Sequence, residues 1–199
     1  MSQRLVLASS SPRRKELLES VGLSIEVISP SADEVMHGGE SPGEFALRVA
    51  FEKAASVSRC LGGNSFVLGA DTIVVVDDVV LGKPADENDA ARMLGLLSGR
   101  EHHVLTAFSI VKPREEPLHA EIVSTSVRVS RLAASEIEGY IKTGEPMDKA
   151  GAYGIQGIGA FMVEGITGSY TNVVGLPVPE VLRALTKLGA VRLFGRDES

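Results

Sequence analysis

The sequence has very little cysteine, no tryptophan and no long apolar run. Its 199 residues include one cysteine, Cys60, which excludes an intrachain disulfide framework and a zinc site built from several thiolates. A reducing compartment fits this content. The first residues place charges beside a very short apolar run and do not predict a signal peptide, and no stretch approaches the roughly 20 apolar residues of a membrane helix. We therefore expect a cytoplasmic globular protein without a membrane span.

Positive charge is also in short supply. The chain has 20 Lys and Arg against 26 Asp and Glu, a formal net charge of −6, which argues against non-specific binding to nucleic acid. Apolar residues make up 44% of the chain, which is ordinary for a globular protein and too much for a disordered one. No internal repeat or linker is evident. We expect one domain over residues 1–199, with room for two lobes that share a core.

Several common catalytic motifs are missing. Gly82-Lys83 does not form a Walker A loop, because Asp77 stands at the position of the required first glycine and Pro84 replaces the Ser or Thr. The histidines show no HExxH spacing, no GxSxG elbow occurs, and the glycines of residues 154–159 do not follow the GxGxxG order. P-loop nucleotidases, zinc hydrolases, elbow-type hydrolases and Rossmann cofactor sites therefore lack support.

Short apolar runs alternate with capped amphipathic stretches along the chain, and these predict strands and helices respectively. The expected strands are residues 4–8, 25–28, 66–76, 79–81, 103–111, 122–129 and 161–166. The expected helices are residues 12–21, 42–60, 89–97, 136–142 and 177–188. Because several strand pairs look like hairpins, we predict an α/β or α+β fold with a mixed central sheet flanked by helices.

Two adjacent arginines stand in the first turn of an expected helix, where Ser11 is the predicted N-cap and Pro12 the first helical residue. The helix dipole makes Arg13 and Arg14 unfavourable there by roughly 0.3–1 kcal/mol each unless an anion lies nearby. Free amides, serine hydroxyls and a guanidinium group after a strand-to-helix turn form a good phosphate site. A pair of solvated surface arginines is the alternative.

One carboxylate, Asp71, lies inside an apolar run. A buried carboxylate is unfavourable unless it is paired, hydrogen-bonded or bound to a metal. Asp71 is therefore either a structural partner of a buried arginine or a helix cap, or else a metal ligand or general base in a cleft. The small residues Gly69 and Ala70 before it would let a ligand approach closely.

Other charged residues give weaker signals. Asp33 and Glu34 follow the second expected strand and could share a divalent cation with Asp71. A set of oxygen ligands favours Mg²⁺ or Mn²⁺ over zinc. Lys53 and Lys83, taken by themselves, are expected to be solvated surface residues.

Six motifs follow one another along the chain. They are Ala8-Ser9-Ser10-Ser11-Pro12-Arg13-Arg14, Asp33-Glu34, Glu52-Lys53-Ala54, Gly69-Ala70-Asp71-Thr72, Gly82-Lys83-Pro84 and Lys149-Ala150-Gly151-Ala152-Tyr153-Gly154-Ile155-Gln156-Gly157. In order and spacing the set resembles the Maf family of nucleoside triphosphate pyrophosphatases, from about residue 5 to residue 185. The resemblance implies an α/β fold with two lobes around a cleft. It also implies hydrolysis of the α–β phosphate bond of a nucleotide with a divalent cation, Mg²⁺ or Mn²⁺.

The same resemblance implies roles for single residues. Asp71 resembles the proton acceptor that activates the attacking water. Arg13, Thr72 and Gln156 resemble the positions that determine specificity, and this combination is similar to the dTTP/UTP branch, whereas the 7-methyl-GTP branch has Trp, Gln and Glu there. The family's polar cleft residues correspond to Ser9, Arg14, Glu34, Lys53 and Lys83.

Cleavage of a phosphoanhydride requires neutralised non-bridging oxygens and a water held in line. Glu34 and Asp71 would hold the divalent ion while the cationic side chains clamp the phosphates. Whether Asp71 is a metal ligand, the base or both stays open at this point. Gln156 carries a donor and an acceptor on one planar group, which suits the imide edge of uracil and thymine.

We predict an enzyme that hydrolyses dTTP and UTP, with modified pyrimidine nucleotides as further substrates. The alternative is a nucleotide-binding regulator of cell division or septum formation with little catalysis, which would not need Asp71 in a buried strand. One apolar stripe on the last expected helix serves either the core or a homodimer contact, and amphipathic terminal helices favour the core. The stripe consists of Val178, Val181, Leu182 and Leu185.

Overall fold

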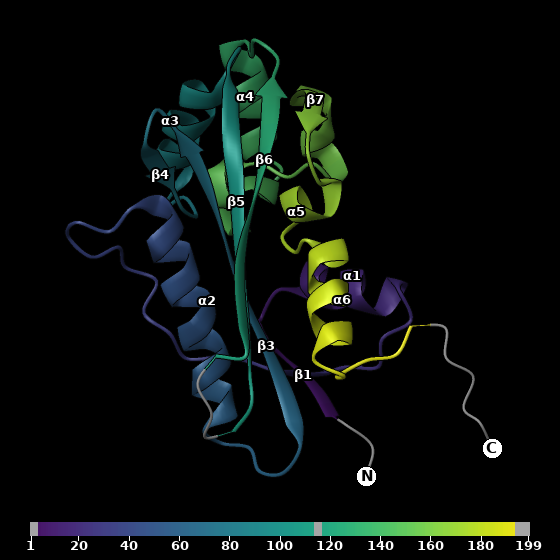
Figure 1. The fold of residues 1–199 in the computed structure, drawn as a ribbon. Coiled ribbons are helices and arrows are strands. Elements are labelled where there is room, and N and C mark those ends of the chain that lie inside the picture. Colours follow the sequence, from purple (N-terminus) through teal and green to yellow (C-terminus); the bar gives the residue numbers. More distant parts are fainter. Residues whose placement is uncertain (1–3, 114–116, 194–199) are drawn as a thin grey trace.

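A seven-stranded sheet runs through the molecule (Figure 1). The computed structural model describes residues 4–113 and 117–193. The strands are β1 (Arg4–Ala8), β2 (Glu26–Ile28), β3 (Ser65–Val76), β4 (Val79–Leu81), β5 (Glu101–Val111), β6 (His119–Val129) and β7 (Val163–Thr167). Their order is β2-β1-β3-β5-β6-β7, with β4 also paired to β3. The pairs of β1 with β2 and β3 are parallel and the other pairs are antiparallel, which confirms the mixed sheet.

Helices cover both faces of one half of this sheet. The α-helices are α1 (Pro12–Ser20), α2 (Pro42–Ser58), α3 (Glu87–Leu97), α4 (Ala134–Ile141), α5 (Tyr170–Val174) and α6 (Val178–Lys187). In Figure 1, α2 lies on one side of β3 and β5, and α1 and α6 lie on the other. Leu5 and Leu7 of β1 join the core with α1 and α6, whereas Val6 and Ala8 join the core with α2. From Leu5 to Ala8 this strand is apolar and buried, because both of its faces are covered.

A separate apolar cluster fills the other half of the molecule. It joins α3 and α4 to the far ends of β3, β5 and β6, with Leu94, Leu97 and Met162 fully buried within it. The long strands β3 and β5 therefore run through two lobes, each with its own packed interior. This arrangement confirms the α/β fold with two lobes that the sequence motifs implied.

Local sequence signals account for most element ends. The Ser41 hydroxyl accepts a hydrogen bond from the Glu44 amide, and the Glu44 carboxylate accepts one from the Ser41 amide, so the capping box before α2 is confirmed. Gly22, with φ of 81°, follows α1 as predicted. Asp77 and Asp78 both have positive φ and form the turn between β3 and β4.

Five elements begin two or three residues away from their expected starts, namely α3, β5, β6, α4 and β7. The last two are instructive. Ala133, not Ser135, is the N-cap of α4, and the Glu136 carboxylate accepts a hydrogen bond from the Ala133 amide at 2.7 Å. A glutamate at the third helical position needs only a backbone donor at the cap, so no serine is required there. Phe161 was expected to begin a strand, but it lies in the 3₁₀-helix η3 (Gly157–Met162), and β7 begins only at Val163.

The apolar stripe of the last helix packs inward. Val178, Val181 and Leu185 of α6 are buried, and the last two join the core with β1 and β3. The preference for a core role over a dimer contact is thus confirmed for these three residues. Among the residues described, no helix has the length and apolar character needed to cross a membrane.

Candidate active site

The site begins at a gap in the sheet. β1 pairs with β3 as far as Gly69, and β4 pairs with the same edge of β3 only from Val74 onward. Between them, the segment from Ala70 to Ile73 pairs with β5 alone among the described strands. Asp71 and Thr72 lie in this gap, where the carboxyl end of β1 leads into α1. A polar side chain in the middle of an apolar strand thus faces an opening instead of the core.

Asp71 is paired with Lys53 of α2. The Lys53 ammonium nitrogen lies 2.7 Å from Asp71 Oδ1 and 2.7 Å from Glu34 Oε1, so it bridges two carboxylates. Both Lys53 and Asp71 are buried, with 6% and 7% of their surface exposed. The expectation of a solvated Lys53 is wrong, because α2 packs directly over the strand that carries Asp71. The buried charges persist because each has a hydrogen-bonded counter-ion.

Gly69 explains how α2 comes so close. A Cβ atom at this position would lie 2.3 Å from the carbonyl oxygen of Ala50 and 2.6 Å from the amide nitrogen of Ala54. The sequence reasoning expected the small residues before Asp71 to admit a ligand. At Gly69 this is wrong, since the group that approaches is the backbone of α2. The missing side chain brings Lys53 within reach of Asp71.

Arg14 is buried and links α1 to β3 and to the end of α5. Its Nε donates to the carbonyl of Gly175 at 2.8 Å and its guanidinium donates to the Thr72 hydroxyl at 3.0 Å. A longer contact of 3.5 Å reaches the Ser9 hydroxyl. Burial lowers the pKa of Arg14 from its ordinary value, although the nearby carboxylates of Asp71 and Glu34 oppose this effect. The positive charge of α1 therefore sits beside the gap in the sheet.

Arg13 reaches across to the other lobe. Its guanidinium pairs with Asp148 at 2.9 Å, and Asp148 belongs to the 3₁₀-helix η1 (Glu145–Asp148). Asp148 also pairs with Lys149 at 2.7 Å. The Arg13 side chain is 27% exposed, and its charge meets a carboxylate 135 residues away in the chain.

A cavity of about 770 Å³ opens over these residues, between the two lobes. It brings together the site residues that the family resemblance implied, namely Ser9, Arg13, Arg14, Glu34, Lys53, Asp71, Thr72, Lys83 and Gln156. Asp33 does not line this cavity, and its carboxylate accepts a hydrogen bond from the Val35 amide instead. Lys83 is exposed at the cavity, as expected. The volume suits a ligand of nucleotide size.

Glu145 fixes the segment that follows Gln156 by hydrogen bonds to its backbone. The Glu145 carboxylate accepts hydrogen bonds from the amides of Ile158 and Gly159, both at 2.9 Å, and from the Tyr140 hydroxyl at 2.9 Å. The Gln156 side chain is exposed to the cavity and makes no hydrogen bond to another described residue. The sequence reasoning missed Glu145 and Tyr140, because no local pattern links them to a segment more than ten residues away.

Glu34 and Asp71 are the two carboxylates that could hold a divalent cation together, since the third carboxylate that lines the cavity, Asp148, is paired with Arg13 and Lys149. The residues described contain no cluster of three or more His, Cys, Asp or Glu side chains suited to a metal. Mg²⁺ usually takes only one or two carboxylates and completes its shell with water and substrate phosphates, so the pair fits an ion that arrives with a triphosphate. Burial raises the pKa of Glu34, but the hydrogen bond and charge of Lys53, helped by Lys83 and Arg14, outweigh this and hold it below its ordinary value.

Comparison with known proteins agrees with this geometry. The family model described as Maf-like protein matches residues 4–188. The chain belongs to the Maf family. Among its Maf relatives, the dTTP/UTP pyrophosphatase of Syntrophotalea carbinolica is 50% identical over 195 residues, which cover 97% of this chain and 88% of the relative. The dTTP/UTP pyrophosphatase of Symbiobacterium thermophilum is 52% identical over 187 residues, which cover 94% and 95% of the two chains.

Proposed function

We propose that this Maf protein hydrolyses dTTP and UTP to the nucleoside monophosphate and pyrophosphate. One observation carries the proposal: Asp71, on the unpaired edge of β3, shares a cavity of nucleotide size with Arg13, Arg14, Lys53 and Lys83. A buried carboxylate in a cavity lined by four cations suits proton transfer from a water attacking a bound phosphate. The relatives that carry the name dTTP/UTP pyrophosphatase support the same activity.

Asp71 is the general base in this proposal. Lys53 donates to its Oδ1, and no other described side chain donates to this carboxylate, so the second oxygen is available to a water. The contact with Lys53 also fixes the direction of the Asp71 carboxylate. The cationic side chains neutralise the charge on the triphosphate, which allows the water to attack in line.

A divalent cation, Mg²⁺ or Mn²⁺, would be held by Glu34 and Asp71 together with the phosphates. When bound, it supplies a Lewis acid for the non-bridging oxygens. Lys53 already bridges the same two carboxylates, so a cation held there would share them with its ammonium. Ser9, at the turn into α1, would bind a phosphate oxygen through its hydroxyl.

Specificity for the base rests on Gln156, with Arg13 and Thr72 contributing from the same cavity. The Gln156 amide offers one donor and one acceptor, which match the imide edge of uracil and thymine. The Thr72 hydroxyl contacts the hydroxyl of Thr106 at 3.0 Å and the carbonyl of Gly175 at 3.3 Å, besides Arg14. Thr72 therefore acts by fixing Arg14. We further propose that the enzyme works in the cytoplasm, as its single cysteine suggests.

The products decide between this enzyme and the alternatives. UTP is incubated with Mg²⁺ in ¹⁸O-labelled water, and the products are resolved by ³¹P NMR. The proposal predicts sustained formation of UMP and pyrophosphate in equal amounts. Release of UDP and inorganic phosphate would point to another phosphatase chemistry. Saturable binding of UTP with no product would favour the nucleotide-binding regulator.

A further inference from the structure

The segment between β2 and α2 forms one wall of the cavity, yet it has no regular secondary structure. Residues 29–41 connect the two elements, and Pro30, Ala32, Glu34 and Met36 line the cavity. Most of this segment is exposed to solvent, so its own side chains bury little apolar surface. Glu34 nevertheless lies 2.7 Å from the Lys53 ammonium. Something other than a packed core must hold its backbone in place.

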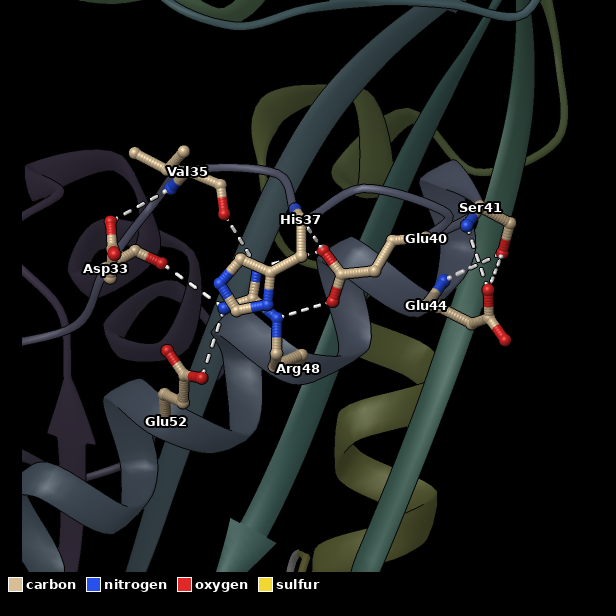
Figure 2. Close-up of polar contacts among 8 residues, drawn as sticks. All are labelled: Asp33, Val35, His37, Glu40, Ser41, Glu44, Arg48 and Glu52. Atoms are coloured by element: carbon tan, nitrogen blue, oxygen red, sulfur yellow. Dashed lines mark hydrogen bonds and ion pairs between the residues drawn. The ribbon is translucent and has the colours of Figure 1, made fainter.

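Arg48 of α2 supplies that hold (Figure 2). Its Nε lies 2.5 Å from Glu40 Oε1 and its second terminal nitrogen 3.0 Å from Glu40 Oε2, a two-pronged ion pair. The same guanidinium donates to the carbonyl of Val35 at 2.8 Å, makes a 3.5 Å contact with the carbonyl of Asp33, and contacts Glu52 at 3.1 Å. Every branch of the guanidinium is thus in use.

Arg48 binds the backbone on both sides of Glu34. The residues on either side of it, Asp33 and Val35, both direct their carbonyl oxygens to Arg48, while the Glu34 side chain reaches Lys53. Arg48 and Lys53 lie five residues apart on the same helix. Helix α2 therefore provides both the anchor for the Glu34 backbone and the partner of its carboxylate.

We propose that Arg48 is a positioning residue, which acts through Glu34 by fixing the segment 29–41 against α2. The pair is durable at neutral pH, because the hydrogen bonds from the Arg48 side chain and the His37 backbone lower the pKa of Glu40 to about 2. The Arg48 and Glu40 side chains are only 20% and 17% exposed, which limits competition from water. Lysine cannot replace this two-pronged contact, since its ammonium is a single point of charge.

The inference rests on the proposed function of Glu34, and two readouts separate them. The first is amide hydrogen exchange of the segment 29–41, which involves no catalysis. We expect faster exchange there in Arg48→Met than in wild type, and no change in the control Arg92→Met, which removes an exposed arginine paired to Asp89 on α3. Unchanged exchange in Arg48→Met would overturn the anchor. If Arg48→Met does not fold, Arg48→Lys provides the same test.

The second readout is a double-mutant cycle on kcat/KM for UTP and on the half-saturating Mg²⁺ concentration. Arg48→Met is expected to reduce kcat/KM and weaken Mg²⁺ saturation by roughly 10–100-fold, as supporting residues of metal sites do. In a Glu34→Gln background the same substitution should have almost no further effect. If the two substitutions together reduced kcat/KM by the product of their separate effects, Arg48 would act independently of Glu34. If Glu34→Gln alone is as active as wild type, the proposed role of Glu34 fails, and exchange still tests the anchor.

Discussion

Gly69→Ala tests how closely the fold and the site are linked. The new Cβ would lie 2.3 Å from the Ala50 carbonyl oxygen. Because carbon and oxygen atoms pack at about 3.4 Å, α2 has to move away from β3 by about 1 Å. The Ala50 carbonyl oxygen and the Ala54 amide nitrogen, which would lie 2.6 Å from the same Cβ, are both backbone atoms of α2, so neither can move aside by a side-chain rotation. The displacement therefore reaches Lys53, which follows Ala50 by three residues.

Two magnitudes follow from this displacement. Overpacking of a core contact costs about 1–3 kcal/mol of stability, which for a chain of this length lowers Tm by roughly 2–12 °C. A shift of about 1 Å in a catalytic group reduces turnover by as much as about 100-fold. A 100-fold loss in kcat corresponds to about 2.7 kcal/mol, so we expect activity and stability to fall by similar free energies. The loss in kcat arises because the moving helix carries the partner of Asp71.

The assay pairs a thermal melt with steady-state kinetics on UTP. Gly95→Ala is the matched control, because Gly95 lies within α3 and a Cβ there would have no neighbour within 4 Å. This control should gain about 0.5–1 kcal/mol from its better helix propensity and keep its activity. A Gly69→Ala protein with the Tm and kcat of wild type would refute the reasoning.

Three further predictions concern other parts of the molecule. Gln156→Glu should reduce kcat/KM for UTP by roughly 10–100-fold relative to purine triphosphates, because a carboxylate cannot donate to the base; an unchanged ranking across a nucleotide panel would remove Gln156 from this role. Glu145→Gln should raise KM for UTP by about tenfold with little change in kcat. The NH₂ group of the new glutamine would replace the carboxylate oxygen that accepts from the Ile158 backbone amide, and two donors would then face each other. Unchanged KM would separate Glu145 from the base site. Burial, with a smaller effect of His103, lowers the pKa of His102 from 6.5 to about 4. Between these pH values His102 is protonated in the unfolded chain but stays neutral in the folded protein. The free energy of unfolding therefore decreases as pH falls. Between pH 7 and pH 5, denaturant melts should show about 2 kcal/mol more loss in wild type than in His102→Gln; equal losses would contradict the burial argument.

Much of the fold was predictable because its signals are local. Residues 5–8 are apolar at every position and short enough for a buried strand, and β1 covers them together with Arg4. The capping box at Ser41 and the paired aspartates after β3 likewise depend only on neighbouring residues. The failures at Ser135 and Phe161 arise where a distant or backbone partner sets the boundary.

The sequence predicted which residues form the site but not which contacts they make. The polar residues that the family resemblance singled out line one cavity, yet no sequence pattern gave a reason for Lys53 and Arg14 to be buried. Those environments depend on partners 18 and 161 residues away, Asp71 and Gly175. Spacing along the chain carries no information about such pairs, and only the packing of α2 and α5 against the sheet creates them.

The turnover of Asp71→Asn is the most direct test of the account. Asparagine keeps the shape of the side chain and an oxygen that can accept from Lys53, which retains its ion pair with Glu34, so the protein should fold normally. It has lost the basic carboxylate, and pyrophosphate release from UTP should therefore fall by about 10²–10⁴-fold. A folded variant that still releases pyrophosphate at a rate close to wild type would contradict the role of Asp71 as the base.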